Sequence, residues 1–311
     1  MHLGLTSWRT DHCAQALIEQ AVFAEQLGYE SFWLTEHHFS DNAIPDPLML
    51  LASVAGDTHT IRLATASYLL PLRHPLHAAE QVSMLDQLSG GRLILGVGRG
   101  VGANMLRAFN VEPKDKRQRF ERHLKIMINA WSGACIADAD DPETGVVLHP
   151  LPVQIPHPPI WVAAFGPKAL AQAGQLGLPY LASPLETIDD IKRNINLHNQ
   201  ACQESKQLIP TTRPILRTVF VSDDKKVVDT LRKRLSENNN ASRWRDQCAS
   251  LDDWAIIGDQ QFASEKIAEY QKRLSMTHLI ISHYHLGDLP QLLLRESLEL
   301  ISQLDSGDNK R

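Results

Sequence analysis

The sequence predicts an α/β protein that folds as a single (β/α)₈ TIM barrel. Short apolar runs alternate with amphipathic helical segments, and in the first hundred residues this alternation repeats about every 30 residues. Parallel neighbouring strands need helical crossovers, so these repeats predict a parallel sheet. Eight strand-like runs, with no Gly-rich turn after the first one at Leu5–Trp8, favour a closed barrel over a doubly wound open sheet.

The predicted elements follow from short apolar runs and from apolar residues at steps of three or four. The expected strands are His2–Ser7, Ser31–Thr35, Ile61–Ala66, Arg92–Gly98, Ile160–Ala164, Tyr180–Ser183, Ile215–Val221 and His278–Ser282. The expected helices are Ala14–Leu27, Pro47–Asp57, Pro75–Leu88, Lys116–Ser132, Lys168–Leu176, Thr187–Gln203, Ser264–Leu274 and Pro290–Leu304.

Two segments depart from the barrel repeat. Asp138–Pro159, before the fifth strand, is a Pro- and His-containing excursion too long for an ordinary connection. Asn238–Asp259 follows the seventh strand, and the family resemblance given below implies a lid region there. We expect one domain over residues 1–304 and a disordered tail over residues 305–311.

Composition limits the classes of partner and the compartment. The formal charge is 31 − 36 = −5, which gives no basic footprint for nucleic acid or an anionic membrane. The four cysteines form no C-x-x-C pair, as is typical of a reduced intracellular protein. Polar residues come too soon after Met1 for the apolar region of a secretory leader, so we expect none. No apolar run reaches the roughly 18 residues of a membrane span. These features predict a cytoplasmic protein without nucleic-acid or membrane partners.

The active site of this fold lies at the carboxyl ends of the strands. Glu36-His37-His38 follows the second strand, and histidine there can donate or accept a proton beside a cofactor. The alternative is a pair of exposed loop histidines. Adjacent side chains diverge, so they do not share a metal ion, and we expect no metal site. Further pocket candidates are Trp8, Tyr68, Trp244, His283 and His285.

Two further segments suit an anion. In Gly98-Arg99-Gly100, after the fourth strand, the glycines allow close approach and the guanidinium suits a phosphate. The alternative is a buried Arg99 paired with a carboxylate. At Phe165–Ala169 a strand passes into a helix whose first N–H groups form an anion site. The basic residues between Lys114 and Lys125 are expected to form a solvated helix face, apart from Arg117.

Five ordered motifs carry a resemblance to a known family: Glu36-His37-His38-Phe39, Pro71-x-x-His74-Pro75, Ala79-Glu80-Gln81-Val82, the run Leu85–Leu93, and Gly96-x-Gly98-Arg99-Gly100. In this order the chain resembles the bacterial luciferase-like flavin-dependent monooxygenases, and around these segments it is similar to their luciferase α chain. The resemblance extends over residues 2–130 and resumes more weakly at Trp161–Pro179 and Ile256–Leu274.

The resemblance implies roles for individual residues. His37 is expected beside the flavin ring as the catalytic residue, next to a flavin-proximal Glu36, and Ala66-Ser67 is expected to be a cis peptide against the ring. Gly98, Arg99 and Gly100, with Arg117, are expected to hold the FMN phosphate. Phe165, Gly166 and Ala169 align with a segment that wraps the phosphate, although the luciferases have Glu, Ser and Thr there.

The implied activity is that of a two-component monooxygenase. Reduced FMN from a separate flavin reductase reacts with O₂ to a flavin C4a-peroxide, which oxygenates a small organic substrate. One alternative is an F420-dependent hydride-transfer oxidoreductase of the same superfamily. Another is a non-catalytic partner subunit similar to the luciferase β chain. The resemblance also implies a homodimer formed through Pro47–Asp57 and Pro75–Leu88.

Overall fold

The computed structural model describes residues 1–8, 14–41, 43–136, 145–237 and 249–304. The chain divides into two compact units, which are described separately. Unit 1 consists of Met1–Trp8, Ala24–Ser31 and Ala164–Arg311, and unit 2 of Arg9–Phe23 and Phe32–Ala163.

Unit 2 contains a parallel sheet in the order β6-β5-β3-β2. Its strands are β2 (Ser31–Leu34), β3 (Arg62–Thr65), β5 (Leu93–Gly98) and β6 (Ile160–Ala163). A two-residue strand, β4 (Tyr68–Leu69), pairs with the end of β5 and places Leu69 opposite Gly98. Every residue of β2 and β5 is buried, as expected for strands covered on both faces.

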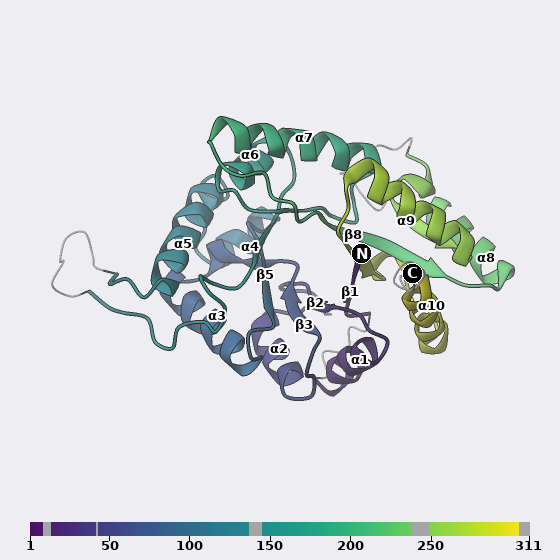
Figure 1. Ribbon diagram of the computed structural model, residues 1–311, viewed down its shortest axis with the longest axis horizontal. Coiled ribbons are helices and arrows are strands. Elements are labelled where there is room, and N and C mark those ends of the chain that lie inside the picture. Colours follow the sequence, from purple (N-terminus) through teal and green to yellow (C-terminus); the bar gives the residue numbers. More distant parts are fainter. Residues whose placement is uncertain (9–13, 42, 137–144, 238–248, 305–311) are drawn as a thin grey trace, which may run out of the picture. The chain divides into compact units, whose positions relative to one another are not determined.

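Helices cover this sheet on its outer side: α2 (Pro47–Ala55), α3 (Pro75–Leu88) and α5 (Lys116–Trp131) lie outside β2, β3 and β5 (Figure 1). A short helix, α4 (Ala103–Ala108), follows β5, and α1 (Ala14–Gln26) begins in unit 2 and ends in unit 1. Helix α2 starts with a side-chain cap, because Asp46 accepts a hydrogen bond from the Met49 amide at 3.1 Å. Trp33 and Trp161 stack at 5.2 Å in the core of the unit.

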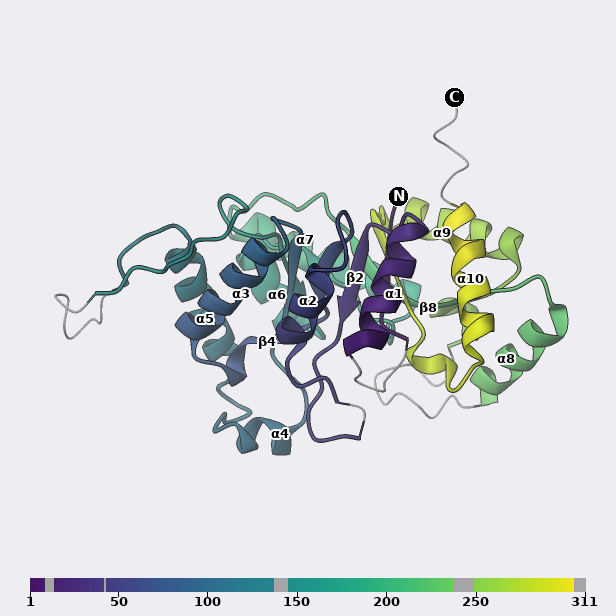
Figure 2. The same ribbon diagram turned by 90° about the horizontal axis from the view of Figure 1, so that it is seen from below.

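Unit 1 contains a second parallel sheet in the order β1-β10-β8-β9. Its strands are β1 (His2–Thr6), β8 (Pro214–Val221), β9 (Ala255–Gly258) and β10 (His278–Ser282), and β7 (Tyr180–Leu181) lies beside β8 through an Ala182–Ile215 bridge. The helices are α6 (Pro167–Gln175), α7 (Ile188–Glu204), α8 (Lys225–Glu237), α9 (Gln260–Leu274) and α10 (Gln291–Leu304); α8, α9 and α10 are visible in Figure 2.

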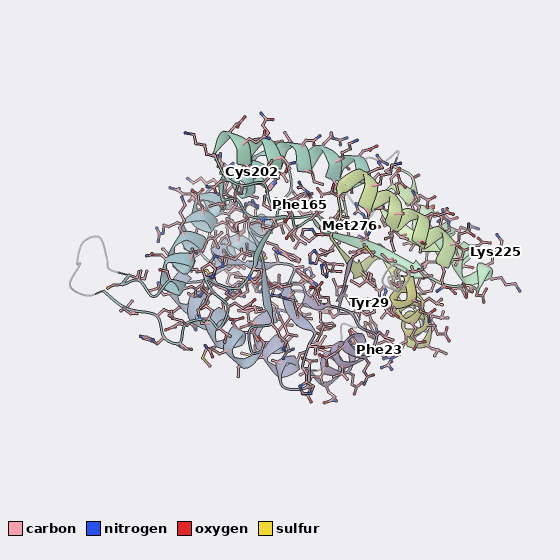
Figure 3. The ribbon with its side chains drawn as sticks, viewed as in Figure 1. Phe23, Tyr29, Phe165, Cys202, Lys225 and Met276 are labelled. Atoms are coloured by element: carbon pink, nitrogen blue, oxygen red, sulfur yellow. The ribbon has the colours of Figure 1, made fainter. Side chains whose placement is uncertain are left out.

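Two close contacts hold helices of unit 1 in place, one at Gly174 and one at Tyr29. A Cβ atom at Gly174 of α6 would lie 2.5 Å from the carbonyl oxygen of His198, so α6 and α7 pack at a distance that only glycine permits. Tyr29, labelled in Figure 3, donates its hydroxyl to the Leu298 carbonyl of α10 at 2.9 Å. The described cysteines, Cys135 and Cys202, are free thiols.

All eight predicted strands are present, and each is within two residues of its expected limits. Two strands, β4 and β9, and two helices, α4 and α8, were not predicted. The prediction of a lid over Asn238–Asp259 is wrong for the end of this range, where the apolar run Ala255–Gly258 pairs in parallel with β8. Residues 238–248, residues 137–144 of the predicted excursion, and the predicted tail lie outside the described residues.

Gly96 is expected to be essential for the sheet of unit 2. A Cβ atom at this position would lie 1.8 Å from the Thr65 carbonyl oxygen, which is backbone and cannot move aside. We expect Gly96→Ala to lower the free energy of unfolding by about 3 kcal/mol or to prevent folding. Gly56→Ala is the control, because a Cβ there meets nothing within 4 Å. Urea unfolding measures both; equal midpoints would contradict the prediction.

Candidate functional site

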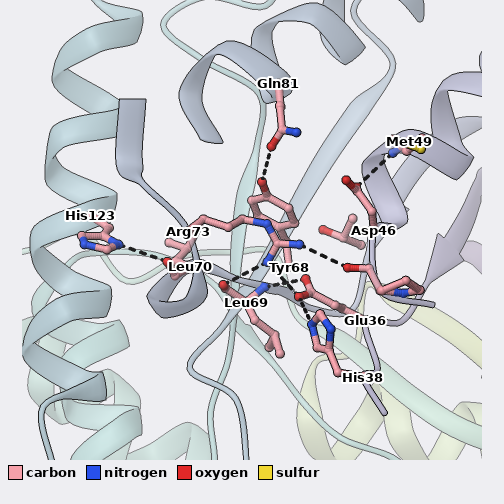
Figure 4. A network of polar contacts seen from close by, with 12 residues as sticks. Glu36, His38, Asp46, Met49, Tyr68, Leu69, Leu70, Arg73, Gln81 and His123 are labelled. Atoms are coloured by element: carbon pink, nitrogen blue, oxygen red, sulfur yellow. Dashed lines mark hydrogen bonds and ion pairs between the residues drawn. The ribbon is translucent and has the colours of Figure 1, made fainter. Parts of the chain in front are cut away.

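A buried carboxylate organises the carboxyl end of β2. The Glu36 side chain is fully buried, and its Oε1 atom accepts hydrogen bonds from Arg73 Nη1 and His38 Nε2, both at 2.7 Å. Its Oε2 atom accepts a hydrogen bond from the Leu69 amide at 2.9 Å (Figure 4). A buried charge is tolerated when it is paired and hydrogen-bonded in this way. Glu36 therefore ties the loop after β2 to β4.

Arg73 extends this network toward α3. Its guanidinium also donates to the Leu69 carbonyl at 3.1 Å and lies 4.0 Å from the centre of the Tyr68 ring. The Tyr68 hydroxyl donates to Gln81 Oε1 at 3.1 Å, and burial raises the pKa of Tyr68 well above its usual range. Sequence reasoning did not select Arg73, because its partner is 37 residues away and no local pattern marks the pair.

The two adjacent histidines have different environments. The His38 ring is held by Glu36 and meets the edge of Phe109 at a centroid distance of 4.8 Å. The His37 side chain is exposed, while its backbone amide donates to the Ile44 carbonyl at 3.0 Å. Desolvation nevertheless lowers the pKa of His37, against the opposing charge of Glu36. His37 is therefore neutral at pH 7 and can either donate or accept a proton.

The peptide bond Ala66–Ser67 is cis, as the resemblance predicts. It directly follows β3, and the Ala66 amide donates to the Leu34 carbonyl of β2 at 2.8 Å. Ser67 Oγ occupies the space in which Gly98 would carry a side chain, since a Cβ there would lie 2.1 Å from this oxygen. Because Leu69 also pairs with Gly98, β4 connects the Glu36 network to the end of β5.

Gly98 and Gly100 lack side chains because of contacts within the protein, and not only for the approach of a phosphate that the sequence suggests. The absence of a side chain at Gly98 leaves room for Ser67. A Cβ atom at Gly100 would lie 3.0 Å from the Cε atom of Met105. Gly100 also has a φ of +75°, a conformation that favours glycine. Both glycines thus allow packing within the protein, and direct approach of a phosphate to them remains a prediction.

Three basic side chains gather where β5 ends. Arg99 is buried, donates to the Ala163 carbonyl at 3.0 Å and lies 4.8 Å from the centre of the Phe120 ring. Burial and the positive charge of Arg117 lower the pKa of Arg99 to about 10. Lys116 donates to the Gly100 carbonyl at 2.9 Å, and burial and Arg99 lower its pKa. Arg99 is thus a buried cation with a second cation beside it, and such a position favours a bound anion.

Lys116 departs from the predicted solvated helix face, because it is half-buried and bonds Gly100. Its position at the start of α5 gives the same sequence pattern as its exposed neighbours, and only the tertiary contact with Gly100 distinguishes it. Arg117 is exposed, and its charge lowers the pKa of Arg99; its role as a second basic position for the phosphate remains a prediction.

The predicted anion site at the start of α6 belongs to unit 1. Gly166, with a φ of +77°, precedes the helix, and the Ala169 amide already donates to the Gly166 carbonyl at 3.1 Å. Phe165 is exposed and is labelled in Figure 3. The Ala169 N–H is thus engaged within the first turn, contrary to its expected role as an open donor. Joint contact of Phe165, Gly166 and Arg99 with one ligand remains a prediction.

A buried histidine lies at the carboxyl end of β10 in unit 1. His283 is 5% exposed, and the edge of its ring faces Trp8 at a centroid distance of 6.4 Å. Burial lowers the pKa of His283 to about 4. The neighbouring His285 differs, because its Nδ1 atom lies 3.1 Å from Thr218 Oγ1. Trp244, another predicted pocket residue, lies outside the described residues.

The low pKa of His283 predicts a loss of stability in acid. Since the folded-state pKa of about 4 lies below the usual 6.5, the unfolded chain takes up the proton first. This stability is complete above pH 6.5 and is lost as the pH falls toward 4, by about 3 kcal/mol from this residue. Urea unfolding at several pH values measures the slope. His283→Leu should flatten it, and an unchanged slope in the variant would contradict the assignment.

Three metal-ligating groups meet at the amino ends of β1 and β10. His2 Nδ1 and His278 Nε2 lie 2.8 and 3.8 Å from Glu30 Oε2. The imidazole rings of His2 and His278 stack at 4.5 Å with an interplanar angle of 23°. A metal ion lies in the plane of each ring that binds it, and two nearly parallel stacked rings do not share such a point. The arrangement is a contact cluster of two histidines and one carboxylate that spacing alone did not reveal.

Comparison with protein families gives one match over most of the chain. Residues 6–278 match the model of the luciferase-like monooxygenases. The chain is 32% identical over 235 residues to the uncharacterized protein y4vJ of Sinorhizobium fredii, with 71% of this chain and 66% of that protein covered. It is 30% identical to the alkanal monooxygenase alpha chain of Photorhabdus luminescens, with 60% and 53% covered.

A third relative is the oxygenase component of the flavin-dependent trigonelline monooxygenase of Acinetobacter baylyi. The identity is 29%, over 67% of this chain and 59% of that protein. The chain spans about half to two thirds of the length of these curated relatives. No described helix combines the length and apolar character needed to cross a membrane.

Solved structures share the fold. Monooxygenase RslO1 of Streptomyces bottropensis superposes with a TM-score of 0.80 at 21% identity, covering 97% of this chain and 98% of that one. The oxygenating constituent of 3,6-diketocamphane monooxygenase from Pseudomonas putida, in complex with FMN, gives 0.77 at 21%, with 97% of both chains covered. The F420-dependent tetrahydromethanopterin reductase of Methanopyrus kandleri gives 0.69 at 18%, covering 97% and 96%.

Proposed function

Because this chain belongs to the luciferase-like monooxygenase family, we propose that it is a monooxygenase that uses reduced FMN and O₂ to oxygenate a small organic substrate. The observation that carries the choice of FMN is the basic cluster of Arg99, Lys116 and Arg117 after β5. Mutually repelling cations are stabilised by a bound dianion, and a phosphate accepts charge-assisted hydrogen bonds from a guanidinium. The cluster therefore fits the phosphate of FMN.

Different residues of unit 2 would bind the phosphate of the flavin and transfer a proton near its ring. When bound, reduced flavin supplies the electrons for O₂ activation. Arg99 holds the phosphate, while Lys116 and Arg117 add positive charge. His37, neutral at pH 7, moves a proton near the ring, and Glu36 positions this loop through Leu69 and Arg73. The family resemblance assigns Ala66 and Ser67 to the flavin ring, and these two residues would support it there.

The partners and the assembly belong to the same proposal. A separate reductase supplies reduced FMN, in agreement with the relative that is named an oxygenase component. A single (β/α)₈-barrel domain over residues 1–304 is part of this proposal. The chain forms a homodimer through α2 and α3, which expose Met49 (71%), Met84 (46%) and Leu88 (57%). Exposed apolar side chains grouped on neighbouring helices are typical of interfaces.

Anaerobic titration of the protein with reduced FMN and with reduced F420, followed by addition of O₂, tests the function. We expect tighter binding of reduced FMN and a flavin absorbance that changes only when O₂ is added. Tighter binding of reduced F420, with no reaction toward O₂, would replace the proposal by hydride transfer. Binding of neither cofactor would indicate a non-catalytic subunit.

A further inference from the structure

Residues 114–125, which lead into α5 and extend along it, form a strongly positive segment of an acidic chain. The segment holds six basic and two acidic side chains, so its net charge is 6 − 2 = +4. The rest of the chain has 25 basic and 34 acidic side chains, a net charge of 25 − 34 = −9. A local excess of one sign of charge creates a potential that acts on charged ligands in solution. The basic residues of the segment are Lys114, Lys116, Arg117, Arg119, Arg122 and Lys125.

Four of these cations are exposed, and we call them the basic face of α5. They are Lys114, Arg117, Arg122 and Lys125, the last of which forms an ion pair at 2.7 Å with Glu121 one turn earlier. Helix α5 lies on the outer side of the sheet of unit 2, so its exposed charges reach the surrounding water (Figure 1). Exposed charges hold a bound ligand weakly, because water screens them, but they act on an ion that approaches from solution.

The positive potential of α5 is continuous with the basic cluster at the end of β5. Burial lowers the pKa of Arg99, and the charge of Arg117 lowers it further. Farther along the helix, burial lowers the pKa of His123, and the charges of Arg119 and Arg122 add to this effect. Helix α5 begins at Lys116, beside the cluster, where the helix dipole contributes positive partial charge. The field therefore extends from the outer face of α5 to the buried guanidinium.

The spacing of these charges matches the distance over which charges act in salt solution. An α-helix rises about 1.5 Å per residue, so Arg122 lies about 7.5 Å along the axis from Arg117. The screening length is about 8 Å at physiological ionic strength and roughly 20 Å at about 20 mM. An anion that approaches the end of β5 is thus within reach of Arg122. The charge of −9 on the rest of the chain repels the same anion, so capture depends on cations within this range.

We propose that the basic face of α5 steers the phosphate of reduced FMN from solution toward Arg99. The inference rests on the proposed function, in which a separate reductase releases reduced FMN and this chain captures it by diffusion. A phosphate dianion suits this face, because it is attracted twice as strongly as a single charge and the face leads to a guanidinium that can bind it. Steering raises the association rate constant without adding a contact to the bound state.

Anaerobic stopped-flow fluorescence tests the proposal, because it measures the association and dissociation rate constants of reduced FMN separately. The α5 variant combines Lys114→Gln with Arg122→Gln, which removes two exposed charges and leaves the three cations of the basic cluster in place. The α8 variant combines Lys225→Gln with Lys226→Gln, at two exposed lysines of a helix in unit 1, and is the matched control. Both variants change the net charge by −2, from −5 to −7, and differ in where the charge is removed.

We expect the α5 variant to lower the association rate constant about fivefold at an ionic strength of about 20 mM. Its dissociation rate constant should stay the same, because no contact with the bound phosphate is lost. The α8 variant should change neither rate constant. At about 0.5 M salt, where the screening length falls to about 4 Å, the difference between the variants should vanish. Reduced riboflavin, which lacks the phosphate, should respond far less to the α5 variant.

Three results contradict steering. Equal losses of association rate in the α5 and α8 variants would assign the effect to total charge. Faster dissociation from the α5 variant would show that Lys114 or Arg122 binds the phosphate directly. A loss that occurs only when the reductase supplies the flavin would show that the face docks this protein instead. The proposed function fails separately: absence of any binding of reduced FMN would refute it, whereas binding with an association rate independent of salt would refute steering alone.

Discussion

Replacement of Arg99 by alanine is expected to weaken the binding of reduced FMN by roughly tenfold to several-hundredfold. In the proposed function the guanidinium would contribute charge-assisted hydrogen bonds to the phosphate. It is buried beside Lys116 and Arg117, where solvent screens its charge little. Reduced riboflavin, which has no phosphate, should lose far less affinity. Arg99→Lys should recover only part of the loss, because an ammonium cannot reproduce the planar fork.

Arg99 also has contacts within the protein, and these define the competing outcome. Its donation to the Ala163 carbonyl and its position over Phe120 support β5 and α5. If that support were its only role, Arg99→Ala would lower Tm and weaken both flavins in parallel. Arg107→Ala, at an exposed arginine of α4, is the control and should change neither affinity. Anaerobic fluorescence titration of the three variants with both flavins distinguishes the cases.

Replacement of His37 by alanine is expected to lower turnover by about 10²-fold or more, with little effect on folding. The imidazole is exposed and neutral at pH 7, which suits proton transfer, and it contributes little to the core. His38→Ala is a matched control in the next position. It removes the 2.7 Å contact with Glu36, so it should lower the free energy of unfolding.

Substrate oxidation with a supplied flavin reductase, measured together with urea unfolding, gives both quantities for each variant. Unchanged product formation by His37→Ala would remove this residue from the mechanism. Loss of turnover in His38→Ala alone would transfer the catalytic role to the histidine that Glu36 holds.

The strands could be predicted because their apolar runs are local features of the sequence. Strand β9 was missed because Ala255–Gly258 is short and lies in a segment that the family resemblance marks as a lid. Arg73, Lys116 and the surroundings of His283 could not be predicted, because their roles arise from contacts between residues distant in the chain. Glu36 shows both cases: its position after a strand marked it as important, yet its three hydrogen-bond donors appear only in the fold.

The buried Glu36 carboxylate has a consequence for how this family can diversify. The Glu36 carboxylate accepts hydrogen bonds from both the Leu69 amide and Arg73. The loop after β2 therefore depends on the segment after β3, and a change in the length of one would break these bonds unless the other changed too. A change in one of these two segments would therefore need a compensating change in the other. The segment after Gly100, where Val101 is exposed and α4 is short, meets this network through a ring contact, since Phe109 lies 4.8 Å from the His38 ring. Because no hydrogen bond of Glu36 reaches that segment among the described residues, changes of length are expected to be accepted there before they are accepted in the other two segments.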